Sequence, residues 1–176
     1  MLLNWFVVYM LDSLITSKTR LRLLVKFFIN AANRGHMRGL AEEFNESTNA
    51  IRKELNNLSE AGYLEKEAQQ NRVSYRANIK HPLFGSLQNI VRKYLGLDHI
   101  VETILNRMGE VEQVVVTGDY AEGRDSGLVE VTIVGPSLNA DYLKRLAPKI
   151  EGVIGRKVVF TLKDQPVDKG LILYEP

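Results

Sequence analysis

The sequence contains no cysteine among its 176 residues and only one tryptophan. The absence of cysteine excludes a disulfide scaffold, a zinc-finger site and a thiol nucleophile, and it fits a reducing compartment. The three histidines, His36, His81 and His99, lie far apart in the sequence without neighbouring ligand residues. We therefore expect no metal, no cofactor and no catalytic histidine.

The chain also lacks an apolar run that is long enough to span a membrane. Its opening, MLLNWFVVYML, is about half of the roughly 20 residues that a spanning helix needs, and it has neither the basic start nor the cleavage site of a signal peptide. We expect a cytoplasmic protein with no membrane partner. We expect residues 1–11 to be an N-terminal extension, in which residues 1–9 are either a mis-assigned start or a hydrophobic arm that packs on a dimer partner.

Neither sign of charge dominates, because the formal net charge is only +2. The two halves differ, however. Residues 12–80 carry 12 Lys and Arg against 8 Asp and Glu, a balance of +4, whereas residues 97–176 carry 9 against 13, a balance of −4. The basic half is therefore where a polyanionic partner is expected.

Helical spacing marks the first part of the chain. Apolar residues between Leu21 and Phe28 recur at i, i+3, i+4 and i+7, which predicts a core helix over Ser17–Asn30. The segment MRGLAEEFN predicts a short second helix. Ser47 is a natural N-cap for a third helix, TNAIRKELNNLSEA, which Gly62 ends.

Two short strands are expected after the third helix. They are Tyr63–Ala68 and Arg72–Ile79, joined by a polar tip at residues 69–71. The stretch LAEEFNESTNAIRKELNNLSEAGYL, residues 40–64, closely resembles the helix-turn-helix of winged-helix bacterial repressors of the arsenic-repressor and multiple-drug-resistance types. The resemblance covers roughly residues 12–80.

This resemblance implies double-stranded DNA as the partner of residues 12–80. A recognition helix in the major groove meets base edges with its N-terminal exposed residues, and the wing meets backbone phosphate or the minor groove. A winged helix that serves protein contacts is the alternative. The candidate DNA-binding residues are Thr48, Asn49, Arg52, Lys53, Asn56, Arg72 and Arg76.

The rest of the chain predicts a helical segment and then a small mixed unit. Residues 81–108 suggest two helices broken near Gly96, which either pack as a linker on both domains or form a dimerisation helix. Residues 109–176 read as strand, turn, strand, helix and strand. The expected fold class is α+β, with an N-terminal winged helix, a helical bridge and a C-terminal α/β domain.

The stretch GDYAEGRDSGLVEVTIVG, residues 118–135, is similar to the turn and second strand of minimal nucleotidyltransferases of the DNA polymerase beta-like superfamily. Gly118, Ala121 and Gly123 match the small residues of that turn. Asp119, however, replaces the serine that meets phosphates, and the two metal-binding aspartates fall at Leu128 and Glu130. Fusions of an arsenic-repressor-like winged helix to such a domain form a recognisable bacterial family.

The departures from the motif predict a degenerate site that is not an enzyme, because two metal ions need several carboxylate oxygens. The remnant nucleotide-site positions are Gly118, Asp119, Gly123 and Glu130. We expect a homodimeric transcriptional regulator whose C-terminal domain serves dimerisation or docking, or senses a small-molecule or nucleotide ligand. The competing hypothesis is an active nucleotidyltransferase with a metal site built from Asp119, Asp125 and Glu130.

Overall fold

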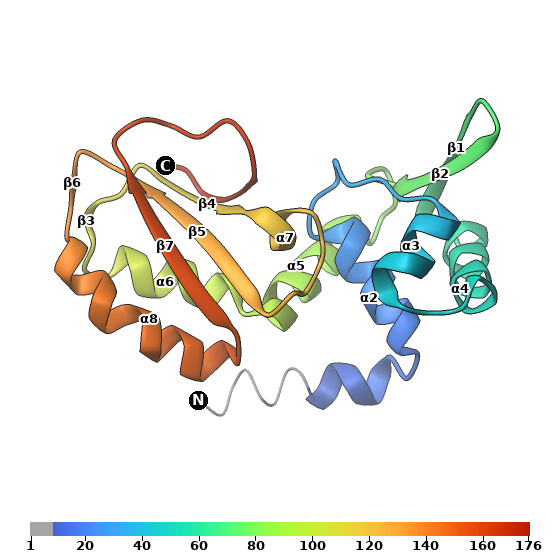
Figure 1. Cartoon of the computed structure of the whole chain (residues 1–176), viewed down its shortest axis with the longest axis horizontal. Helices are drawn as coiled ribbons and strands as arrows, with labels where there is room; N and C mark the ends of the chain where they lie inside the picture. The colour runs from blue at the N-terminus through green and yellow to red at the C-terminus, as the bar shows by residue number, and fades with distance from the viewer. Residues whose placement is uncertain (1–8) are drawn as a thin grey trace.

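The computed structural model describes residues 9–176 and has the mixed α+β composition that the sequence predicts (Figure 1). Residues 9–14 are helical, and the hydrophobic arm or upstream start expected at residues 1–9 lies almost wholly outside the described residues. The labelled helices are α2 (Lys18–Phe28), α3 (Met37–Phe44), α4 (Thr48–Glu60), α5 (Phe84–Leu95), α6 (Leu97–Leu105), α7 (Gly118–Ala121) and α8 (Ala140–Ile154). The strands are β1 (Leu64–Gln69), β2 (Arg72–Ala77), β3 (Gly109–Glu110), β4 (Gln113–Thr117), β5 (Leu128–Val134), β6 (Ser137–Leu138), β7 (Lys157–Lys163) and β8 (Leu171–Tyr174).

The N-terminal unit, residues 9–80, is built from α2, α3, α4 and the β1–β2 hairpin. Ser17 caps α2 by accepting a hydrogen bond from the amide of Arg20 at 3.2 Å. Ser47 caps α4 in the same way, as the sequence predicts, with the amide of Ala50 at 3.2 Å. Asn45 ends α3 in the left-handed conformation, so the chain turns sharply between α3 and α4.

The β1–β2 hairpin is antiparallel, with Leu64 opposite Ala77 and Gln69 opposite Arg72. It ends two residues before the predicted Ile79, because Asn78 turns the chain by donating its side-chain amide to the carbonyl of Gly62. Gly35, just before α3, exchanges two backbone hydrogen bonds with Tyr75, at 3.1 and 2.7 Å. This isolated bridge fastens the hairpin to the start of α3.

Helices α5 and α6 connect the N-terminal unit to the sheet. Gly96 separates them in the left-handed conformation, with φ of 75°, where the sequence predicts the break. Helix α5 packs on α2, where the rings of Phe28 and Phe84 lie 5.7 Å apart, and α6 packs on α8 and β8. The two helices thus pack on both units, as expected of a linker, and both the linker assignment and the alternative of a dimerisation helix stay predictions.

The C-terminal unit, residues 109–176, contains a four-stranded sheet of order β7-β5-β4-β8. Strands β5 and β7 are parallel and joined by α8, and the other pairs are antiparallel. Figure 1 shows α6 and α8 on one face of the sheet and the loop before β8 on the other. Strand β8 and the short β3–β6 ribbon are absent from the sequence prediction. β7 and β8 form the two edges.

One hydrophobic core runs through both units and the connecting helices. No helix within residues 9–176 combines the length and apolar character needed to cross a bilayer. Representative core residues with no exposed surface are Phe27, Phe28 and Ile51 in the N-terminal unit, Leu95, Leu97 and Ile104 in the connecting helices, and Val114, Ile133 and Ile150 in the C-terminal unit.

Candidate functional site

Helix α4 presents a polar outer face whose members belong to the predicted recognition helix. Thr48, Asn49, Arg52 and Lys53 are exposed, and Asn56 is half-buried. The opposite face packs into the core through Ile51, Leu55 and Leu58. The structure therefore brings the five predicted α4 residues to the surface, four of them within the first two turns.

The buried carboxylate of α4, Glu54, points away from this outer face and holds α4 to α2. It accepts hydrogen bonds from the hydroxyl of Ser17 at 2.9 Å and from Nε of Arg20 at 2.8 Å. Burial opposes ionisation, but these two bonds and the positive charge of Arg20 outweigh it, so the pKa of Glu54 is lowered. Because the Glu54 charge is turned inward and paired with Arg20, the outer face of the first half of α4 is left with the cations Arg52 and Lys53.

The two arginines predicted for the hairpin differ in their surroundings. Arg72 is exposed next to the tip. Arg76 is half-buried and forms ion pairs across the hairpin with Glu65 at 2.9 Å and Glu67 at 2.5 Å. The prediction grouped both as DNA contacts, but the carboxylates of β1 already engage Arg76, which leaves Arg72 as the arginine that the hairpin presents outward.

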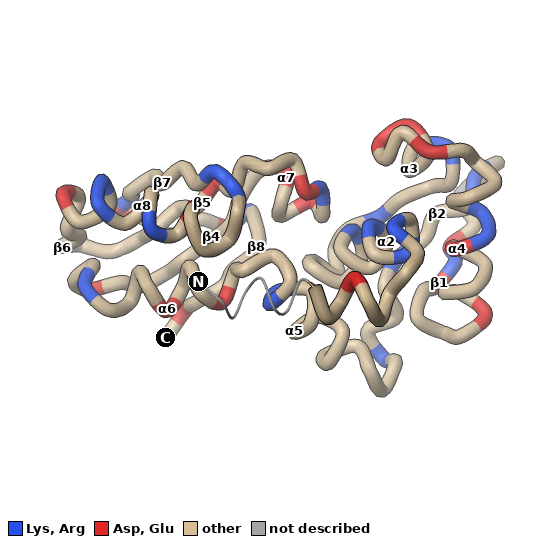
Figure 2. The backbone as a smooth tube through the Cα atoms, turned by 90° about the horizontal axis from the view of Figure 1, so that it is seen from below, with Lys and Arg blue, Asp and Glu red and all other residues tan. Residues whose placement is uncertain are grey.

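The prediction from the sequence did not include two further cations near α4. Arg38 is exposed in the first turn of α3, and Lys66 is exposed on β1 with its ammonium 5.9 Å from the ring centre of Tyr75. Figure 2 shows Lys and Arg along α2 and α4 in this part of the molecule. A basic residue at the start of the predicted second helix was the available signal for Arg38.

Gly118 and Glu130, two of the predicted remnant positions, lie together. Glu130 pairs with Thr117 across the β4–β5 ladder, and its carboxylate lies directly over Gly118. Gly118 has φ of 64°, and a Cβ there would collide with the Glu130 carboxylate. The turn therefore needs glycine both for its backbone and for the space that Glu130 fills.

The other carboxylates of this region do not join Glu130. Asp119 forms an ion pair with Arg124 at 2.5 Å. Asp125 forms one with Arg156, also at 2.5 Å. Within residues 9–176 no group of three or more His, Asp or Glu side chains is arranged to hold a metal ion. The unconventional metal site of the competing hypothesis is therefore not assembled by the described residues.

Asp125 belongs to a polar network that the sequence did not reveal. It accepts a hydrogen bond from the hydroxyl of Tyr120 and two from Arg156, at 2.9 and 2.5 Å. Burial opposes its ionisation, but the bonds from Arg156 and Tyr120 outweigh burial and lower the pKa of Asp125. Burial and the bond to Asp125 raise the pKa of Tyr120. The Arg156 guanidinium also lies 5.8 Å from the ring centre of Tyr94 on α5.

Gly123 makes the close backbone approach predicted for the turn, but toward α2. A Cβ on Gly123 would lie 2.5 Å from both Cα and the carbonyl oxygen of Lys26. Beside this contact, the side chain of Asn30 donates to the carbonyl of Ala121 at 3.2 Å. The turn that resembles a nucleotide-handling motif is thus the point where the C-terminal unit docks on the N-terminal unit.

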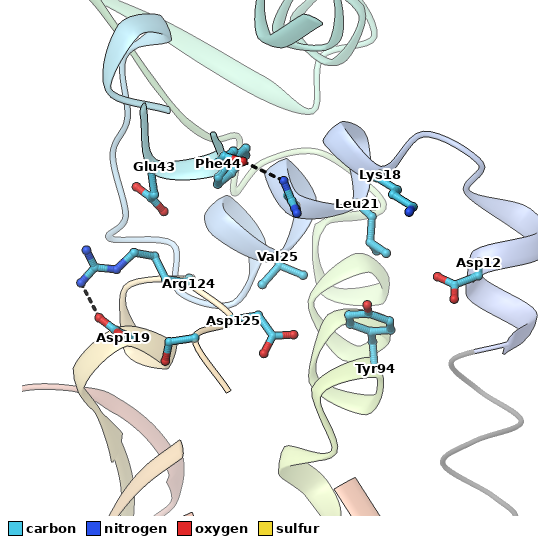
Figure 3. Close-up of a pocket in the computed structure, with 13 residues that line it drawn as sticks. Asp12, Lys18, Leu21, Val25, Glu43, Phe44, Tyr94, Asp119, Arg124 and Asp125 are labelled. Carbon is cyan, nitrogen blue, oxygen red and sulfur yellow. Dashed lines mark hydrogen bonds and ion pairs between the residues drawn. The ribbon is translucent and has the colours of Figure 1, made fainter. Parts of the chain in front are cut away.

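A cleft of about 640 Å³ opens beside this docking point, between α2 and the loop of residues 119–126 (Figure 3). We call it the interdomain cleft. Asp119 and Gly123 line it, whereas the remnant positions Gly118 and Glu130 do not. Its lining residues are Asp12, Lys18, Leu21, Arg22, Val25, Glu43, Phe44, Tyr94, Asp119, Gly123, Arg124, Asp125 and Ser126.

Comparison of the chain with family models, with curated proteins and with solved structures yields no match. Any function must therefore be argued from the residues and their geometry.

Proposed function

We propose that this protein is a sequence-specific regulator of transcription that binds double-stranded DNA through α4 and the β1–β2 hairpin. The exposed first half of α4 carries the proposal. Its outer side chains are hydroxyl, amide and cationic groups, and the acidic side chain in this half of the helix, Glu54, is buried and turns inward to Arg20. Such groups are those that hydrogen-bond to base edges in the major groove.

Within this proposal, Arg52 pairs with guanine, and Asn49 or Asn56 pairs with adenine. Arg72, exposed at the hairpin, meets backbone phosphate or the minor groove. Ser47 caps α4 rather than contacting bases, since its side chain accepts the amide of Ala50. Arg76 contributes to the shape of the hairpin through its ion pairs with Glu65 and Glu67.

The proposal assigns residues 12–80 to a winged helix and residues 109–176 to a nucleotidyltransferase-like domain without catalytic activity. The order of three helices and a hairpin, with Gly35 bridged to the hairpin, supports the first assignment. The separate engagement of Asp119 by Arg124 and of Asp125 by Arg156 supports the second. A regulator of this bacterial kind acts in the cytoplasm.

The regulator is proposed to act as a homodimer. One recognition helix reads few base pairs, and a two-fold protein doubles the interface on a palindromic site, with half-sites about 34 Å apart. The expected mass in light scattering is twice the 19.9 kDa of the chain.

The deciding experiment measures binding of the purified protein to the duplex upstream of its own gene and to a scrambled duplex, by fluorescence anisotropy at several salt concentrations. Tighter binding to the upstream duplex that weakens with salt is expected. Arg52→Ala should cost roughly 1 to 3 kcal/mol and relax specificity at one position, and Arg72→Ala should weaken both duplexes alike.

Lys149→Ala is the matched control, because Lys149 is an exposed cation on α8, far along the chain from the proposed interface. It should leave both affinities unchanged. Equal affinity for the two duplexes at every salt concentration would overturn the proposal and would turn attention to protein partners for the same surface.

A further inference from the structure

We propose that the interdomain cleft binds a small amphipathic anion, an apolar body with a carboxylate, sulfonate or similar group, and that its binding weakens DNA binding. The cleft volume, about 640 Å³, is in the range of sites for small organic molecules. The regulatory half of this inference rests on the proposed DNA-binding function, and the binding half does not.

The apolar part of the site comes from both sides of the cleft. Leu21 and Val25 lie one turn apart on α2, and Phe44 is at the end of α3. Figure 3 shows Leu21 directed toward the ring of Tyr94 on α5. These side chains offer a surface on which an aromatic ring or a short aliphatic chain can be buried.

The anion-binding part comes from Lys18 and Arg22, which are also one turn apart on α2. Three of the carboxylates that line the cleft already form ion pairs with neighbouring cations. Glu43 pairs with Lys26 at 3.0 Å, Asp119 with Arg124 at 2.5 Å, and Asp125 with Arg156 at 2.5 Å.

Asp12, on the N-terminal helical segment, is the fourth lining carboxylate. Figure 3 places it to the side of the cleft, with Lys18 nearer the top. A ligand is therefore oriented with its negative group at Lys18 and Arg22, on the α2 side, and with its apolar body between Leu21 and Tyr94.

Arg22 connects the cleft to the DNA-reading helix. It donates to the carbonyl of Phe44 at 2.9 Å and to Glu46 at 2.8 Å, and Glu46 also accepts the hydroxyl of Thr19. Phe44 and Glu46 stand at the turn between α3 and α4. An anion in the cleft competes with Glu46 for Arg22, so binding releases the turn that positions the first residues of α4.

The test uses 8-anilinonaphthalene-1-sulfonate, an apolar ring system with one negative charge, in a fluorescence titration of the full chain. We expect saturable binding of one dye per chain. Lys18→Glu should weaken it at least tenfold, and Lys149→Glu, the same charge change on α8, should leave it unchanged. N-phenyl-1-naphthylamine, the matched dye without the sulfonate, should bind weakly and respond to neither variant. Equal binding of the sulfonate dye by Lys18→Glu and the wild type would overturn the binding site.

The second arm measures duplex binding by mobility shift with and without saturating sulfonate dye. We expect at least a fivefold loss of affinity for the wild type. Arg22→Gln, which lacks the cation that the dye and Glu46 share, should bind the duplex more weakly and no longer respond. An unchanged wild-type affinity in saturating dye would overturn the coupling. Dye binding that depends on Lys18 without any duplex preference would overturn the proposed DNA function and leave the cleft site intact.

Discussion

Gly123 lies at a close contact between the two units, and its substitution tests that contact. Gly123 has φ of 77°, and an added Cβ would lie 2.5 Å from the backbone of Lys26. Gly123→Ala should therefore lower the free energy of unfolding by roughly 2 to 4 kcal/mol, through backbone strain and a clash that must separate the units.

Gly127→Ala provides the control for this experiment in urea denaturation. Gly127 also has a positive φ, 86°, but a Cβ added there would meet no atom within 4 Å. It should cost about 1 kcal/mol, from the backbone alone. Equal losses for the two variants would show that the contact with Lys26 adds nothing to stability.

Glu54 is predicted to make stability depend on pH. Its folded-state pKa lies below its usual value near 4.5, so its contribution is complete at neutral pH and is lost as the pH falls below that value. Glu54→Gln should lower the free energy of unfolding by about 1 to 2 kcal/mol at neutral pH, because it weakens the bond to Arg20. The loss is modest because Arg20 is partly exposed to water, and the difference from wild type should shrink in acid.

Urea titrations at several pH values measure this difference directly. Glu60→Gln, an exposed substitution at the end of the same helix, is the matched control and should differ little from wild type at any pH. A Glu54→Gln penalty that stays constant down to acid pH would contradict an ionised, hydrogen-bonded Glu54.

At the scale of elements, the ion pair between Asp125 and Arg156 fastens the loop of residues 124–127 to the start of strand β7. Arg156 is largely buried, with 12% of its side chain exposed, so removing its partner leaves a poorly solvated cation. Asp125→Asn should lower the free energy of unfolding by about 2 kcal/mol, measured as a lower melting temperature. Asp164→Asn, exposed in the loop after β7, should change little.

The elements of the N-terminal unit were predictable because their signals are local. Ser17 and Ser47 accept amide hydrogen bonds from residues three positions on, and Asn45 marks the break after α3 by its own backbone conformation, as Gly96 does after α5 in the connecting helices. A sequence displays such signals within a few residues. The bounds of α4 therefore follow from its cap and apolar spacing, and the exposed residues of the candidate interface follow from those bounds.

Elements that depend on distant partners were not predictable in this way. β8 gains its place by pairing with β4, more than 50 residues earlier in the chain, and a four-residue strand carries little pattern of its own. Arg156 and Asp125 are 31 residues apart. The ion pairs of Arg76 with β1 depend on the hairpin register, which the predicted strand ends did not specify.

For the molecule as a whole, the continuous core predicts that both units unfold together. Buried side chains of α5 and α6 contact one another and the cores on either side, so neither unit can lose its packing alone. Differential scanning calorimetry should show one transition whose calorimetric and van 't Hoff enthalpies agree. Two resolved transitions would show that the units are thermally independent.

The charges on edge strand β7 have a consequence for the behaviour of the protein at high concentration. β7 offers seven residues at the edge, and Lys157 and Lys163 stand at its two ends. If two copies paired antiparallel around Phe160, Lys157 of each would oppose Lys163 of the other, and like charges directly opposite are unfavourable. The lysines therefore disfavour sheet-to-sheet pairing of β7 in this register, the role that charged side chains at a sheet edge commonly serve.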